Sequence, residues 1–525
     1  MKRFVIAAAL AAATIPASCS RNEVEMPAPG SAGEECIELA HGMIRLGERL
    51  EDPYTVENMT RAFSALYPTK AASDYISTTD LYVRFLPKTE EEYDLLEGLG
   101  LQMIDHPVDF SILQEGDYYH DPSVPEDEFT WQYAVVPYDF EFPEGVEYEV
   151  IDKCYIAEHK VVTRASAGID WSAVERQSFE MTGNGGLIAP ATKSSEGPSG
   201  RIYIHDDKLE EDVGVAGVKV SCNVFVKFAS AYTDEEGYYQ MGTSFSNRPR
   251  YRIVFKNVKG FAMGFNLVIV PASFSTLGKG DPDGVDCYIT KDSDRMLFCR
   301  SVVNNACYDY YCQCEAEKDR IRTPPANLRL WLFKNLSSSS AVMLQQGALV
   351  DGGLLAKFLG DYIDLLKMFL PDVTLGLRGK EDYASIYHTA IHECAHASHY
   401  MQVGNGFWDK YIKFVLSSFV TSGFITYGIG TEKNHGYCEV GEMWAYYIET
   451  VMFRERYAAD ITSFGADNWF FPQIFCYMDE RGINRYRIFQ ALTSDIIDKD
   501  ILQEKLLSMY PECKTIIKQA FDRYI

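Results

Sequence analysis

The chain has 525 residues and a formal net charge of −26. Its hydrophobic share of 47% and aromatic share of 13% are ample for folded cores, which excludes wholesale disorder. The length predicts about three domains. The negative charge argues against nucleic acids and anionic membrane surfaces as partners, and it fits a soluble exported protein.

The N-terminus has the pattern of an export signal. Lys2 and Arg3 precede an apolar run over residues 4–15, which is too short to span a bilayer. The pattern predicts a signal peptide over residues 1–18. No later segment of the chain predicts a membrane span.

Cys19 follows directly after this signal, with the small residue Ser18 before it. This junction resembles the processing site of bacterial lipoproteins, although Pro16 stands where that pattern prefers Leu. The resemblance implies that Cys19 is acylated and that a lipid anchors the protein at a bacterial outer membrane or cell surface, with residues 19–34 as a flexible tether. Ordinary cleavage and secretion is the alternative.

Residues 35–195 alternate between helix and strand signals and predict a small α+β domain of unassigned role. The expected helices are 55–66, with Thr55 as its cap, and 89–98; the expected strands are 81–86 and 131–137.

A turn-rich linker then leads into a segment of alternating strand patterns, which predicts an antiparallel sandwich over residues 196–272. The expected strands are 200–204, 214–220, 233–239 and 251–255. Their order resembles the carboxypeptidase regulatory-like domain, a transthyretin-like β-sandwich. The resemblance implies a non-catalytic spacer or binding module.

Residues 273–525 form the last predicted domain. Its expected elements are helices 296–320 and 354–369 and strands 328–333 and 373–377, with an almost wholly helical end after Glu449. Thirteen cysteines are compatible with an oxidising compartment, and five of them lie between Cys287 and Cys314. Both disulfides and buried free thiols remain open for this cluster.

The most informative stretch is His392-Glu393-Cys394-Ala395-His396, an H-E-x-x-H pattern in a helical context. Two histidines four residues apart lie on one face of a helix and can bind a single metal ion. Glu393 lies beside that position, where it can take a proton from a bound water. The stretch therefore predicts one Zn²⁺ per chain, with His392 and His396 as ligands and Glu393 as the catalytic base.

Spacing narrows the search for a third ligand. A metzincin would continue with Gly and His where this chain has His399 and Gln402, so that class is excluded. No carboxylate occurs between Asp409 and Glu432. The next cluster reads as a helix over residues 438–449, with Glu439, Glu442, Tyr446 and Glu449 along one face.

Glu442 stands three residues before Ala445 with an aromatic residue between them, and this pattern resembles the gluzincin metallopeptidases. The resemblance implies that Glu442 is the third metal ligand and that Glu439 accepts a hydrogen bond from a ligand's imidazole. Asp409 and Glu432 remain weaker alternatives.

Gluzincins often add a tyrosine or histidine that hydrogen-bonds the developing oxyanion. The candidates here are His435, Tyr437 and Tyr446, and His399 is a further candidate for lining the site.

The sequence thus predicts a multidomain α+β protein: a small α+β N-terminal domain, a transthyretin-like sandwich, and a zincin-like α+β peptidase domain with an α-rich C-terminal lobe. The expected function is a zinc-dependent peptidase that hydrolyses peptide bonds of a peptide or protein substrate through a metal-activated water. A zinc hydrolase with another substrate is open. The main alternative is a catalytically inactive cell-surface binding lipoprotein built on a peptidase fold, and the intact Glu393 argues for the enzyme.

Overall fold

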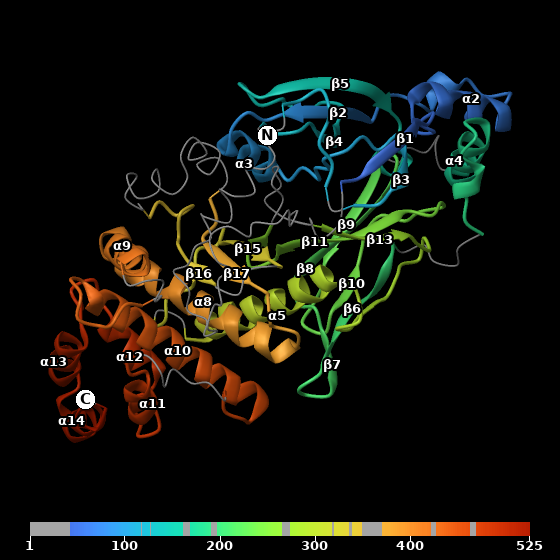
Figure 1. Cartoon of the computed structure of the whole chain (residues 1–525). Coiled ribbons are helices and arrows are strands. Elements are labelled where there is room, and N and C mark those ends of the chain that lie inside the picture. Colours follow the sequence, from blue (N-terminus) through green and yellow to red (C-terminus); the bar gives the residue numbers. More distant parts are fainter. Residues whose placement is uncertain are drawn as a thin grey trace, which may run out of the picture.

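The structure is a computed structural model that describes residues 43–116, 118–125, 128–160, 168–190, 197–264, 274–317, 320–334, 339–348, 370–421, 427–461 and 469–524. The predicted signal peptide, Cys19, the tether and the predicted helix 354–369 lie outside the described residues. Within the described ranges, the chain is a mixed α+β protein with several sheets (Figure 1). No helix among them is both long enough and apolar enough to cross a membrane.

The structure confirms the helices and strands expected in residues 35–195, which we call the N-terminal unit. Thr55 caps the first helix by accepting a hydrogen bond from the Asn58 amide at 3.2 Å. A ribbon of β1 (Arg45–Arg49) and β3 (Phe110–Gln114) lies beside a sheet in which β2 (Asp80–Leu86) pairs with β4 (Gln132–Pro137) and β5 (Glu147–Cys154). The helices are α2 (Val56–Leu66), α3 (Glu90–Gly98) and α4 (Trp171–Met181).

Two sheets form the middle of the chain. One contains β6 (Ser199–Asp206), β7 (Glu211–Gly214), β10 (Tyr238–Gln240) and β14 (Cys287–Ile289). The other contains β8 (Val218–Val224), β9 (Lys227–Tyr232), β11 (Arg250–Asn257) and β13 (Phe274–Lys279). Buried side chains of both sheets, including Ile204, Val220 and Ile253, belong to one core.

Two of the strands expected here are interrupted by turns. Residues 214–220 are divided between β7 and β8 because Gly217 adopts φ +65°, and residues 233–237 form a turn in which Gly237 adopts φ +84°. A positive φ is accessible to glycine at little cost and ends the extended conformation.

The second of these sheets continues into the C-terminal half in the strand order β16, β17, β15, β12, β11, β8, β9, with β13 paired to β11. The added strands are β12 (Ala262–Met263), β15 (Arg329–Phe333), β16 (Ser340–Ala341) and β17 (Val373–Gly376). β12, β15 and β17 run parallel, and β16 is antiparallel at the edge. Strands on both sides of the predicted boundary at residue 272 therefore share one hydrogen-bonded sheet.

The helices of the C-terminal half pack around α8 (Tyr383–Val403), which carries the H-E-x-x-H residues. α8 contacts α5 (Arg295–Ala316), α9 (Asn405–Thr421), α10 (His435–Tyr457) and the strands β16 and β17. Most residues of α8 are buried, which agrees with the small and apolar residues that flank the H-E-x-x-H stretch within it. The helices α11 (Gln473–Asp479), α12 (Arg485–Ala491), α13 (Lys499–Met509) and α14 (Lys514–Arg523) lie beyond α10 (Figure 1).

The eleven cysteines within the described residues are free thiols, including the five between Cys287 and Cys314. The sequence left both disulfides and free thiols open for that cluster, and the structure has free thiols. Cys394 lies on the side of α8 that faces α5, where its sulfur is 3.4 Å from that of Cys307.

Ion pairs join the N-terminal unit to the long sheet. Lys256 of β11 pairs with Glu97 of α3 at 2.7 Å, and further pairs are Arg250 with Glu115, Lys227 with Glu158, and Arg329 with Glu90. In each pair the acid belongs to the N-terminal unit and the base to the sheet. The contact between the two parts is therefore electrostatically complementary.

The Lys256–Glu97 pair offers a direct test of the contact between the N-terminal unit and the long sheet. Glu97→Lys should lower the melting temperature because it places two cations together, and adding Lys256→Glu should restore most of the loss. The expected coupling is about 1 kcal/mol for this partly buried pair, measured by calorimetry on the two single variants and the double variant. Strictly additive effects would show that the pair does not contribute to docking.

Candidate functional site

The site begins with the helix α8 and the way it is held. Asp382 caps its N-terminus by accepting a hydrogen bond from the Ser385 amide at 2.8 Å, and Gly404 ends it at φ +72°. His392 and His396 lie one turn apart on it, with ring centroids 4.9 Å apart. Their Nε2 atoms both approach the carboxylate of Glu442 on α10.

The distances among these three side chains match a metal site. His392 Nε2 lies 3.5 Å from Glu442 Oε2, and His396 Nε2 lies 3.5 Å from Glu442 Oε1. These separations are longer than a normal hydrogen bond. They match the edge of a tetrahedron with metal–ligand bonds of about 2.1 Å, which is roughly 3.4 Å. Among the described residues, this is the group of potential ligands whose donor atoms all lie within 4.8 Å of one another, so it can hold a metal ion.

The chemistry of the donor set also fits a divalent cation. The three side chains are buried, and His392 Nε2 makes no hydrogen bond to any described residue. Burial opposes protonation of His392, but Glu442 and Glu449 outweigh it and raise its pKa to about 10. Burial likewise opposes ionisation of Glu442, and the two imidazoles outweigh it and hold the Glu442 pKa below its usual range. A divalent cation would displace the proton from His392 and balance the same buried carboxylates.

Glu449 orients the His392 imidazole, a role that the sequence assigned to Glu439. Its carboxylate contacts His388 Nδ1 at 2.6 Å and His392 Nδ1 at 2.7 Å. Glu439 instead pairs with Lys499, at 3.3 Å from its ammonium group and 3.2 Å from its amide. The acceptor for the His392 ring is therefore Glu449, and the expectation for Glu439 requires this correction.

The direction of the two helices explains the difference. α8 and α10 run antiparallel, so residues after Glu442 lie toward His388 and residues before it lie toward the other end of α8. Seven residues of α-helix bring Glu449 back to within about 20° of the Glu442 direction. A shift of three residues toward the N-terminus instead directs Glu439 to α13.

Two residues of α9, Trp408 and Tyr411, complete the surroundings of the donor set. Tyr411 donates a hydrogen bond from its hydroxyl to Glu442 Oε1 at 2.7 Å, and its ring lies 5.7 Å from that of His396. Trp408 lies edge-on to His396 at 5.9 Å. No sequence pattern links α9 to the metal-binding residues, and the sequence analysis missed both.

Glu393 is fully buried beside the two histidines, and neither of its carboxylate oxygens hydrogen-bonds to a described residue. Burial raises its pKa to about 8, with Glu442 and Glu449 acting in the same direction and His392 opposing them. The buried Lys380 interacts electrostatically with both Glu393 and Glu449. Lys380 is a second feature of the site that the sequence analysis did not identify.

The candidates for lining the site have different surroundings. Tyr446 lies edge-on to His392, with ring centroids 4.5 Å apart. His399 is buried, its ring nitrogens make no hydrogen bond to described residues, and burial lowers its pKa to about 3, so its imidazole is neutral. His435 contacts the Glu432 carbonyl at 2.8 Å, and Tyr437 contacts Lys410 at 3.0 Å.

The two alternative ligands, Asp409 and Glu432, are not part of the donor group. The Glu432 carboxylate accepts hydrogen bonds from the amides of Ile429 and Thr431 within its own loop.

No family model, curated protein or solved structure matches this chain.

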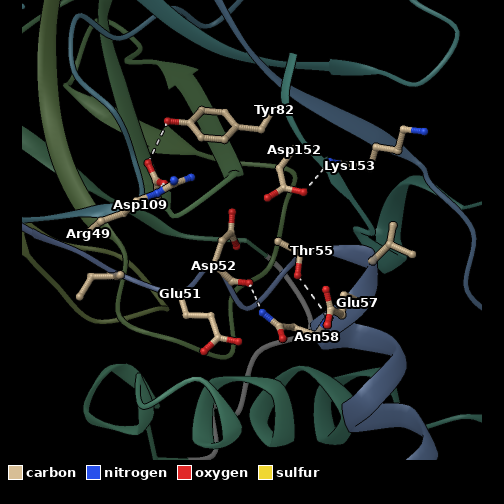
Figure 2. A pocket seen from close by; sticks show the side chains of 12 residues that line it. Arg49, Glu51, Asp52, Thr55, Glu57, Asn58, Tyr82, Asp109, Asp152 and Lys153 are labelled. Carbon is tan, nitrogen blue, oxygen red and sulfur yellow. Dashed lines mark hydrogen bonds and ion pairs between the residues drawn. The ribbon is translucent and has the colours of Figure 1, made fainter. Parts of the chain in front are cut away.

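A separate, acidic cavity of about 520 Å³ lies in the N-terminal unit (Figure 2). Asp52, Asp109 and Asp152 come to it from three different segments. Asp52 is 8% exposed, accepts a hydrogen bond from the Tyr54 amide at 2.8 Å, and has no partner among the described residues for its other oxygen. Burial raises its pKa to about 7, with Asp109 and Asp152 contributing.

The metal site predicts an order of metal affinities. Glu442→Ala removes one of the three potential ligands and should weaken binding of a divalent metal most. Glu449→Ala should weaken it by about 10–100-fold through loss of His392 orientation, and Glu439→Ala should leave it nearly unchanged. Competition with a chelator measures all three on one scale. A larger loss for Glu439→Ala than for Glu449→Ala would contradict the arrangement.

The pKa of Asp52 gives a prediction for stability against pH. A carboxyl whose pKa is raised in the folded state destabilises the fold once the pH exceeds its unfolded value near 4, and the cost is complete above about 7. Asp52→Asn should therefore stabilise the protein at pH 8, by up to about 4 kcal/mol, and the gain should shrink as the pH approaches 4. Thermal unfolding at both pH values measures this. An equal gain at both would show that ionisation of Asp52 is not the cause.

Proposed function

We propose that the protein is a zinc-dependent peptidase whose metal is held by His392, His396 and Glu442. The single observation that carries this proposal is the convergence of two imidazoles and one carboxylate at 3.5 Å separations, with Glu393 adjacent in the same helix. Two histidines and a glutamate are a donor set that zinc takes in catalytic sites with a further open position.

The proposed mechanism assigns a separate task to each residue. Zinc, when bound, supplies Lewis acidity that polarises the scissile carbonyl and acidifies a water molecule. Glu393 would take a proton from a water molecule at the site and deliver it to the departing amine. Its raised pKa suits a group that must both accept and release a proton near neutral pH. Glu449 keeps His392 in the tautomer that leaves Nε2 available, because it holds Nδ1 at 2.7 Å.

We further propose a zincin-like domain, a transthyretin-like module, and export with lipid anchoring. A strand, β17, precedes the metal-binding helix and a short antiparallel strand, β16, forms the edge of the sheet next to it, as in a zincin-like domain. The two facing sheets around β6 and β11 support a transthyretin-like module. The signal pattern and Cys19 support export and lipid anchoring at a bacterial membrane, which would place a peptide or protein substrate outside the cell.

A second candidate function is a surface-binding lipoprotein in which the metal is structural. The observation in its favour is the burial of the donor set: His392 is 2% exposed, and His396 and Glu442 are 0% exposed. The edge strand β16 is also buried, and the carbonyl of Ala341 already accepts a hydrogen bond from Trp408 Nε1 at 3.0 Å. Closed sites of this kind are typical of structural zinc.

Glu393→Gln separates the two candidates. The peptidase proposal predicts that the variant keeps about one zinc per chain and loses activity on peptide substrates by about 10²–10⁴-fold. Glu432→Gln, a matched change in the nearby loop, should keep both properties. Zinc content and turnover of a mixed peptide library are measured on all three proteins. Full turnover by Glu393→Gln would remove it from the mechanism, and a zinc-loaded wild type without turnover would favour the binding protein.

A further inference from the structure

A small cavity lies where the N-terminal unit meets the long sheet, away from the metal site. It has a volume of about 160 Å³ and is lined from the N-terminal side by residues near His106 and from the sheet side by four basic residues. These are Arg248, Arg250, Arg252 and Lys279.

The strand register explains why the basic side chains meet. Arg250 of β11 lies opposite Lys279 of β13 and opposite Asn223 of β8. Cross-strand neighbours share a face of the sheet, and Arg252, two residues after Arg250, shares it too. The sheet therefore presents a concentrated positive charge to the N-terminal unit, within a protein whose net charge is −26.

Arg252 is the most constrained member of this group. It is 5% exposed, its Nη2 donates a hydrogen bond to Asn223 Oδ1, and no carboxylate of the described residues lies within ion-pair distance. Burial lowers its pKa to about 10, so the guanidinium remains charged at neutral pH. A buried charge without a directly paired counter-charge is unfavourable.

The charges of Asp105 and Glu115 favour the charged form of Arg252 from a distance, but both acids have closer partners. Glu115 pairs with Arg250, and Asp105 contacts His106 Nδ1 at 2.8 Å. Arg248 and Lys279, both exposed, form no ion pair with a described residue. Arg248, Arg252 and Lys279 thus face the cavity without an ion-paired acid among the described residues.

We infer that this cavity binds a small oxyanion, either free phosphate or sulfate or the terminal phosphate or sulfate group of a larger molecule. Guanidinium groups bind such oxygens through paired, charge-assisted hydrogen bonds. The volume lies below the roughly 300 Å³ at which pockets for larger organic ligands begin, which fits one tetrahedral group. Since the lining comes from both parts of the molecule, the bound anion would also stabilise their contact.

The acidic cavity shown in Figure 2 provides an internal control. Leu50 lines both cavities, so they lie close together. Lys153 lines the acidic one and is exposed like Lys279. Lys153→Gln therefore removes the same charge from the same region without touching the basic cavity.

The experiment titrates inorganic phosphate into the full-length protein at constant ionic strength, by calorimetry and by the shift in melting temperature. One site per chain is expected. Lys279→Gln and Arg248→Gln, both at exposed positions, should each weaken binding about tenfold, consistent with the loss of one charge-assisted contact. Lys153→Gln should leave it unchanged.

Absence of saturable binding by the wild type would overturn the inference, and so would an equal loss in Lys153→Gln, because that result would indicate a response to overall charge. Sulfate and phenyl phosphate are titrated in parallel. Binding of the inorganic ions would identify a free anion as the ligand, and binding of phenyl phosphate alone would identify the terminal group of a larger one.

Discussion

The antiparallel contact between α8 and α10 is the interaction on which the rest of the site depends. Trp444 of α10 donates a hydrogen bond from Nε1 to the carbonyl of Ala395 at 3.1 Å, and both residues are buried. This contact fixes the position of α10 along α8 at which Glu442 meets the two histidines. It also places Glu449, two turns after Glu442 on α10, within reach of His388 and His392.

Charge balance is the second constraint. Glu393, Glu442 and Glu449 are buried within one small region together with His392 and His396. Without a metal, the carboxylates hold a proton on His392, and Glu393 has a pKa raised to about 8. A divalent cation relieves this crowding of negative charge more effectively than one proton. The same reasoning, with the opposite sign, applies to the cavity around Arg252, where four basic side chains gather and only Arg250 among them is ion-paired with a described acid.

The sequence was sufficient wherever the relevant spacing lies within one element. Helical periodicity located His392, Glu393 and His396 on α8, and it located Glu442 and Glu449 on the face of α10 that turns to them. The sequence was insufficient for features that depend on how elements cross. Glu439 and Glu449 look equivalent along one helix, and only the antiparallel direction of α8 and α10 distinguishes them. Tyr411 and Lys380 reach the site from segments with no motif.

The sheets of the middle of the chain likewise show that the sequence did not predict how distant elements meet. The strand patterns of β6, β8 and β11 were recognisable, because alternation is local. β13 and β14 lie after the predicted boundary and still pair with β11 and β6. The sequence did not predict this pairing, because hydrogen bonding between distant strands leaves no local pattern. Gly217 and Gly237 did mark turns, and their positive φ values divide segments that alternation alone had joined.

The most direct test of the account is the metal content of the purified protein, measured by mass spectrometry beside the variant His396→Ala. The account predicts about one zinc per chain in the wild type and almost none in the variant. Absence of zinc from both proteins after zinc has been supplied would contradict it, and so would equal zinc content in the two.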